Sequence, residues 1–420
     1  MTDTIALPRK IRDRMALPPI EALPAVLAAA PHRLMFFAGA SAILTSMLRW
    51  AAVLCGARFG FPHMPPAPVP PGWAHAILTQ YGMLPLFVLG FLLTVFPRWT
   101  SQPALPRSRY VPVFAGMFGG YLVAHAGLLG HGGIFIAGLA LMLAGWIAAM
   151  AALGGVLARG GGDAHAWSCY AALALGACGL AAFIAFALGA PWQLAFVAIK
   201  LGTFGLLLPL YFTVCHRMIP FFSANVVAGY RIVRPAWSLP ALWILLIAHL
   251  GLELTHRYDT LWVADVPLFA LFAWHWIAWQ PWKARRPGLL AALHLAFAWL
   301  PVAFALFSAQ SLIDFLGHGF LLGRAPVHAL AIGFFGSMLV AMATRVTQGH
   351  AGRPLEMGPI AWFCFGAVQI VALLRIGAEL AHDHAFWLAI AACAWIVAFL
   401  PWVLRSAWIY LTPRADGKPG

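Results

Sequence analysis

Apolar runs of about the length that crosses a lipid bilayer recur along this chain, and they constrain its fold more than any other feature. A spanning α-helix needs roughly 20 apolar residues, and such runs follow one another here, separated by segments rich in Pro and Gly. Of the 420 residues, 63% are hydrophobic and 9% are charged, whereas a soluble domain carries about 25% charged residues. The sequence therefore predicts an all-α, polytopic integral membrane protein whose first partner is the lipid bilayer.

The runs predict about twelve transmembrane helices in one membrane domain. The expected spans are residues 33–56, 73–96, 110–130, 132–158, 166–188, 191–215, 237–256, 260–280, 288–308, 324–346, 359–380 and 384–411. Residues 1–32 would form an N-terminal tail, residues 33–411 the membrane domain and residues 412–420 a C-terminal tail. Several connections are only a few residues long, so the helices they join are expected to be antiparallel neighbours.

The positions of Lys and Arg test this number of spans, because these residues concentrate in the cytoplasmic loops of membrane proteins. With a cytoplasmic N-terminus, nineteen of the 26 Lys and Arg lie in or next to cytoplasmic segments, and only Arg58, Arg257 and Arg324 lie on the outer side. One span more or fewer would spoil this bias, so both termini are predicted to be cytoplasmic. The net charge of +14 is spread over separate loops, and no nucleic-acid binding is predicted from it.

Two predicted helices, 73–96 and 324–346, resemble each other. Each has a His-Ala pair near its outer end (His75 and His328), glycines in its middle and an arginine near its cytoplasmic end (Arg98 and Arg345). Neutral imidazole is a ligand of haem iron and copper, and facing helices of a bundle can hold a cofactor between them. The pattern favours the two histidines as a ligand pair. Chance similarity, with both histidines merely anchored at the headgroups, is the alternative.

The hypothesis of a cofactor site also extends to further histidines and arginines on both sides of the membrane. His125 lies at a depth similar to that of the predicted pair and is a third candidate ligand. On the cytoplasmic side His216, His294 and His350 form a second possible metal-binding group. The arginines on that side could meet haem propionates, a quinone headgroup or lipid phosphate, or could simply be loop residues that set the orientation. The arginines are Arg98, Arg217, Arg345 and Arg353.

Charged residues within predicted spans mark function by default, since they are expensive in a bilayer. Lys200 lies near mid-membrane, and either a proton or ion relay or a structural partner such as a backbone carbonyl would account for it. Arg375 and Glu379 are four residues apart and are therefore expected to share one helix face and to neutralise each other.

Several motifs together resemble the NnrS family. PHRLMFF at 31–37 is similar to the family's PFRPFF, and GFLLTVFPRWT at 90–100 to GFLLTAVPNWT. RMIPFFSAN at 217–225 is similar to GRVIPFFTRN, and LH with AWL at 293–300 to the family's LH…AWL helix. The most specific match is 328–355, where HAL, then Arg345, then GHAGRPL resemble HALTVG…R…GHTGRPL.

The resemblance implies a multi-spanning protein of the bacterial inner membrane that is tied to nitric oxide and to nitrosative stress and contains haem and copper. It implies haem held by His75 and His328. One motif departs from the family's pattern, because Ile77, Leu78 and Thr79 replace the second His, the Glu and the Met of HxHEM. His216 also stands where the family has glycine. Copper is therefore expected less than haem.

The sequence leaves the type of activity open. No P-loop, HExxH or CxxCH motif is present, so no enzyme class is indicated. The first functional hypothesis is a haem protein of the nitric oxide response. The alternatives are a transporter or a metal- or haem-handling assembly factor for a respiratory complex, and a structural subunit of such a complex.

Overall fold

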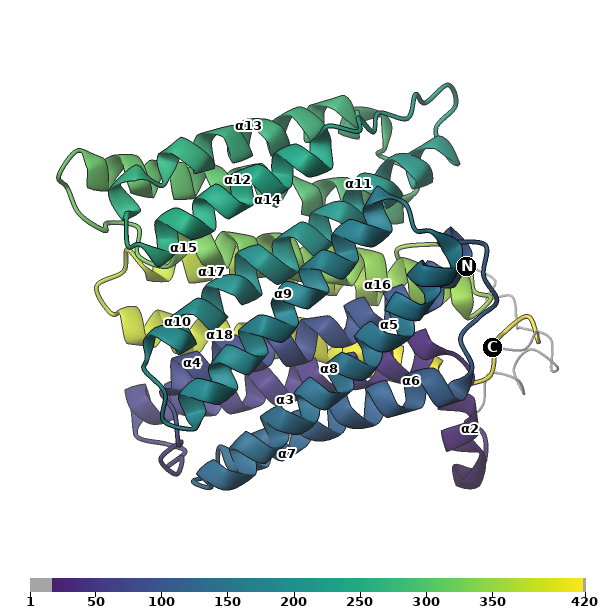
Figure 1. Ribbon diagram of the computed structural model, residues 1–420, viewed down its shortest axis with the longest axis horizontal. Helices are drawn as coiled ribbons and strands as arrows, with labels where there is room; N and C mark the ends of the chain where they lie inside the picture. Colours follow the sequence, from purple (N-terminus) through teal and green to yellow (C-terminus); the bar gives the residue numbers. More distant parts are fainter. Residues whose placement is uncertain (1–16, 418–420) are drawn as a thin grey trace, which may run out of the picture.

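The computed structural model describes residues 17–417, and in that part of the chain every regular element is a helix (Figure 1). The all-α prediction is confirmed there. Both ends of the chain lie at one end of the bundle, called here the terminal end, and the opposite end is called the distal end (Figure 1). The basic residues of the predicted N-terminal tail, Arg9 to Arg14, lie outside the described residues.

A long helical segment stands at each position where a span is predicted. The segments are α3 (Pro31–Phe59), α4 to α5 (Pro71–Trp99), α6 to α7 (Arg107–Gly127), α8 (Gly132–Gly160), α9 (Ala164–Ala187), α10 to α11 (Gln193–Ala224), α12 (Ser238–Leu254), α13 (Trp262–Ala278), α14 (Gly288–Phe315), α15 to α16 (Ala325–His350), α17 (Pro359–Ala378) and α18 (His384–Leu411). A short α2 (Leu23–Leu27) precedes them.

Nine of these segments, among the described residues, are long and apolar enough to cross a membrane. The other three are α6 to α7, which begins with Arg107 and Arg109, and the 17-residue helices α12 and α13. A multi-pass membrane protein is therefore confirmed, while twelve spans and cytoplasmic termini stay predictions.

Four long segments contain a stretch of π-helix, in which the turn is wider than in an α-helix. These stretches are η2 (Leu78–Met83), η3 (Ala115–Gly119), η4 (Leu201–Leu207) and η7 (Ala329–Gly336). A glycine in three of them leaves room for a neighbouring side chain: Tyr121 at Gly82, Gln80 at Gly202 and Trp299 at Gly333. π-Helical turns are rare and often stand at functional sites.

Glycines also allow a close helix–helix contact, between α6 to α7 and α8. A Cβ on Gly145 would lie 2.5 Å from the Met117 nitrogen and 2.8 to 2.9 Å from backbone atoms of Gly116. Small residues let helix backbones approach in this way, and the contact area then comes from the main chain itself.

Asp163 fixes the start of α9. Its Oδ1 accepts a hydrogen bond of 3.0 Å from the Ala166 N–H, and its Oδ2 pairs with Arg217. Partial burial by itself raises the pKa of the Asp163 carboxyl, but these bonds outweigh it and hold the pKa below its ordinary value of 3.8. The ion pair thus stabilises the fold at neutral pH and is lost when the carboxyl is protonated.

Asp163→Asn tests this ion pair, because Asn keeps the helix cap and removes the charge. We expect a loss below about 1 kcal/mol in the free energy of unfolding at neutral pH, since the side chains are partly exposed. A group with a depressed folded pKa stabilises above its unfolded pKa, so the difference should vanish as pH falls through 3.8 and below. Unfolding in detergent between neutral and acidic pH measures it. A difference that does not change with pH would contradict the assignment.

Candidate functional site

His75 and His328 reach the distal end on two short helices of similar design. α4 (Pro71–Ile77) and α15 (Ala325–His328) each carry a proline in the first turn, where the missing N–H costs no hydrogen bond. Each histidine lies in the last turn, close before a π-helical stretch: η2 begins three residues after His75, and η7 begins immediately after His328. Both helices lie at the left of Figure 1, away from the chain ends.

The two imidazoles are held in different ways. The His75 ring stacks on Trp50 of α3, with 4.6 Å between the ring centroids and 8° between the planes. His328 Nδ1 lies 2.9 Å from the Arg324 carbonyl oxygen. Because a carbonyl only accepts, Nδ1 carries the proton, and Nε2 of the neutral ring keeps the lone pair that a metal takes.

These two histidines lie at the same end of the bundle, within electrostatic range of each other, and Arg375 on α17 lies within the same range of both. Arg375 Nη1 is paired with Glu379 Oε1 at 2.5 Å, so the predicted pairing of these two residues is confirmed. The site therefore combines two imidazoles with a buried guanidinium group whose charge is balanced by the Glu379 carboxylate.

Arg49 on α3 adds a second cation to the distal end. It interacts electrostatically with His75 and with His125, and its Nε is buried without a hydrogen-bond partner. An unpaired buried donor of this kind suits an anionic group such as a carboxylate. His125 on α7 is bonded through Nδ1 to the Tyr121 carbonyl oxygen at 3.0 Å. It thus belongs to the same region, connected to the histidine pair through Arg49.

Three predicted cofactor-binding arginines lie at the terminal end, on the side opposite the histidine pair, as predicted from the sequence. Arg98 is 23 residues from His75 on one continuous helix, which places the two roughly 35 Å apart at the α-helical rise. The Arg345 guanidinium lies 3.8 Å from the Phe222 ring centroid, and that of Arg353 lies 4.8 Å from the ring of Trp408. The structure does not bring these arginines to the histidine pair.

The predicted second metal group is divided among three places. His350 lies beside His32, with 4.2 Å between ring centroids. His216 Nδ1 lies 3.0 Å from Nε2 of His165, and His294 Nε2 lies 3.2 Å from Ser223 Oγ. Within residues 17–417, no group of three or more His, Cys, Asp or Glu side chains gathers closely enough to hold a metal ion.

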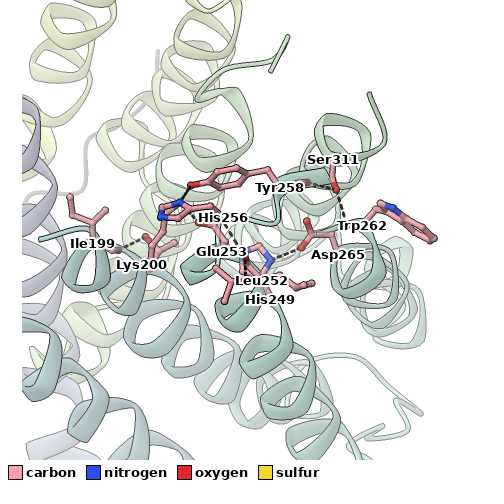
Figure 2. A network of polar contacts seen from close by, with 12 residues as sticks. Ile199, Lys200, His249, Leu252, Glu253, His256, Tyr258, Trp262, Asp265 and Ser311 are labelled. Carbon is pink, nitrogen blue, oxygen red and sulfur yellow. Dashed lines mark hydrogen bonds and ion pairs between the residues drawn. The ribbon is translucent and has the colours of Figure 1, made fainter. Parts of the chain in front are cut away.

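Sequence reasoning missed a buried polar network at the distal end (Figure 2). Lys200 on α10 pairs with Glu253 on α12, and His249 Nδ1 lies 2.6 Å from Asp265 Oδ1 on α13. His249 and Glu253 are one helical turn apart, with 3.7 Å between Nε2 and Oε1. That spacing was a usable signal, whereas nothing in the sequence indicates that α13 places Asp265 beside His249. Lys200 thus has a carboxylate partner and not a backbone carbonyl.

Comparison with known protein families gives a match. The family model described as NnrS protein matches residues 26–414, which is nearly the whole chain. No curated protein matches the chain. The matched region contains both distal-end histidines and the complete helical bundle.

Proposed function

This chain belongs to the NnrS family, and from that premise we propose that it is a haem-binding protein of the bacterial inner membrane that acts in the response to nitric oxide and nitrosative stress. The observation that supports the proposal is that His75 and His328 lie at the same, distal end of the bundle, within electrostatic range of each other. Two helices far apart in the sequence supply them, as in bundles that hold a cofactor between facing helices.

The residues around the pair fit a haem. Its iron takes imidazole nitrogens as axial ligands, and the tautomer of His328 leaves Nε2 free for that role. A haem also carries carboxylates, and Arg49 offers a buried guanidinium nitrogen without a partner at this end of the bundle. The stacking of His75 on Trp50 fixes the orientation of one ligand ring before any cofactor binds.

Copper fits this site less well. At the positions where the family pattern supplies further ligands, Ile77 is fully buried and Leu78 is 2% exposed. These hydrocarbon side chains offer no donor atom, and Thr79 offers only a hydroxyl. The proposal is therefore confined to haem.

A haem bound at the distal end would also be accessible to nitric oxide. The gas dissolves in the bilayer, and the histidines stand on helices that contribute to the membrane domain. When bound, a haem would supply iron, for which nitric oxide is a ligand that competes with an imidazole. The chain's own contribution is to hold the ring nitrogens and to exclude bulk water.

Absorption spectra of the protein purified in mild detergent test the proposal. We expect a Soret band and near-stoichiometric iron, with a shift on reduction by dithionite. His75→Ala and His328→Ala should each lower bound haem by more than about tenfold. Losing a residue that only hydrogen-bonds to a metal ligand already lowers metal affinity by about that factor. His384→Ala is the matched control, because His384 also bonds a carbonyl oxygen through Nδ1, at 2.8 Å from Ala378.

Two results would overturn the haem proposal. One is a folded, colourless and metal-free wild-type protein, after which the transporter or assembly-factor prediction would come first. The other is full haem content in both histidine variants. If the haem is present, titration with nitric oxide follows, and a spectral shift that is complete at one equivalent per haem is the expected result.

A further inference from the structure

The buried network of Lys200, His249, Glu253 and Asp265 lies apart from the proposed haem ligands, on α10, α12 and α13 (Figure 2). The side chains of His249 and Asp265 are fully buried, that of Glu253 is 5% exposed and that of Lys200 is 23% exposed. Ionisable groups at such positions in a membrane bundle call for a function beyond stability.

A cavity of about 550 Å³ stands beside this network. Lys200 and Glu253 line it, together with Tyr258, Asp314 and Arg324. Arg324 is exposed, so the cavity reaches the surface of the bundle near its distal end. Its volume and polar lining suit water. Lys200 and Glu253 thus separate a water-accessible space from His249 and Asp265 behind them.

The charges of the network require one more proton. Lys200 carries one positive charge, and Glu253 and Asp265 carry two negative charges when ionised. A net charge buried in a low-dielectric bundle is costly, and one proton bound among His249, Glu253 and Asp265 removes it. The network is neutral with that proton and has a net charge of −1 without it.

The atoms of His249 indicate where the proton binds. Nδ1 donates to Asp265 Oδ1 at 2.6 Å, while Nε2 is buried without a hydrogen-bond partner and faces Glu253 Oε1 at 3.7 Å. Protonation at Nε2 converts the neutral ring to an imidazolium between two carboxylates. A hydronium ion in the cavity gives up the proton and leaves water, the Glu253 carboxylate carries the proton as a transient carboxyl group, and the only net change in the network is the new N–H bond at Nε2.

The other helices packed around His249 bring few further titratable or charged groups close to it. η4 presents Phe204, with 4.0 Å between ring centroids, and α14 presents Phe304 and Phe307. Tyr258 interacts electrostatically with Glu253 and is bonded to His256 at 3.1 Å. Asp314 and Arg324 also line the cavity. The strongest influences on the proton are therefore the four members of the network.

We propose that His249, Glu253 and Asp265 form a proton-binding site, that this site exchanges one proton with water in the distal cavity, and that the ammonium group of Lys200 limits its occupancy to that one proton. None of the four residues is a proposed haem ligand, although Arg324 of the cavity wall also bonds His328, and the inference does not depend on the haem proposal.

Infrared difference spectra of the protein in lipid nanodiscs, recorded between successive pH values, test the proposal. We expect one protonation step with imidazole and carboxyl bands, and its loss in His249→Gln. Lys200→Met should move the midpoint to higher pH by roughly 1–3 units, and Glu253→Gln should move it to lower pH by a similar amount, as expected for removal of a neighbouring charge. The double variant Lys200→Met/Glu253→Gln restores the charge balance, so its midpoint should return close to that of the wild type.

His275→Gln is the matched control, because His275 is also fully buried and its ring nitrogens contact Leu271 and Ser238 and no carboxylate. It should leave the step unchanged. A step that survives in His249→Gln, or shifts of the same sign in Lys200→Met and Glu253→Gln, would overturn the inference. The same spectra of His75→Ala should keep the step, and this separates its outcome from that of the haem test.

Discussion

Replacing Arg375 with methionine is expected to lower the free energy of unfolding by about 3–5 kcal/mol. Arg375 and Glu379 are bonded at 2.5 Å and both side chains are 9% exposed. Methionine keeps most of the hydrocarbon volume and removes the positive charge. Glu379 would then be a nearly buried carboxylate without its ionic partner, and an unpaired buried charge destabilises the folded state.

The double variant Arg375→Met/Glu379→Leu separates this cost from packing. Replacing both members of a buried pair by apolar groups is often close to neutral, so the double variant should recover most of the stability, as measured by unfolding in detergent mixed with sodium dodecyl sulfate. Arg58 and Asp383 provide the control, being paired at 2.7 Å with side chains 39% and 46% exposed. Arg58→Met should cause no measurable loss, and a loss as large as that of Arg375→Met would refute the argument from burial.

Gly145→Ala should destabilise the protein by about 1–3 kcal/mol, the usual cost of overpacking. The added Cβ would lie 2.5 to 2.9 Å from backbone atoms of Met117 and Gly116. Backbone atoms cannot rotate away as a flexible side chain can, so the two helices must separate and lose contact along their length. Gly145→Leu should abolish folding of the bundle or leave very little folded protein.

Gly366→Ala on α17 is the matched control for this prediction. A Cβ at Gly366 would meet no atom within 4 Å, and alanine favours a helix over glycine by up to about 1 kcal/mol. The control variant should therefore be neutral or slightly more stable than the wild type. If both alanine variants behave alike in the same unfolding assay, close backbone packing is not what glycine supplies at position 145.

The sequence predicts what depends on local composition. The lengths of the apolar runs gave the helices, because burial in lipid requires long apolar segments. The spacing of Arg375 and Glu379 gave their ion pair, since residues four apart share a helix face. The flanks of His75 and His328 suggested equal depth, and the helices that carry them, α4 and α15, both lie at the distal end. Each of these inferences uses only the residues next to one another along a single helix.

Contacts between helices could not be predicted in this way. Asp265 beside His249, and His32 beside His350, depend on which helices are neighbours and on how each is rotated. The separation of Arg98 from His75, in contrast, follows from the sequence, because the two residues stand at opposite ends of the continuous helix Pro71–Trp99. Proximity in sequence is converted into distance when the intervening residues are helical.

The π-helical turns have a consequence for how this chain can vary. A bond from residue i to residue i+5 encloses one residue more than an α-helical bond, so the side chains before η2 or η7 are out of phase with those after it by about 100°. An unbroken helical wheel drawn through 71–99 therefore assigns His75 to the wrong face. Deleting one residue within Leu78–Met83 would turn His75 away from Trp50, on which it stacks, while α5 (Leu84–Trp99) kept its packing. The direction in which the His75 side chain points is thus encoded by a count of residues as well as by their identity.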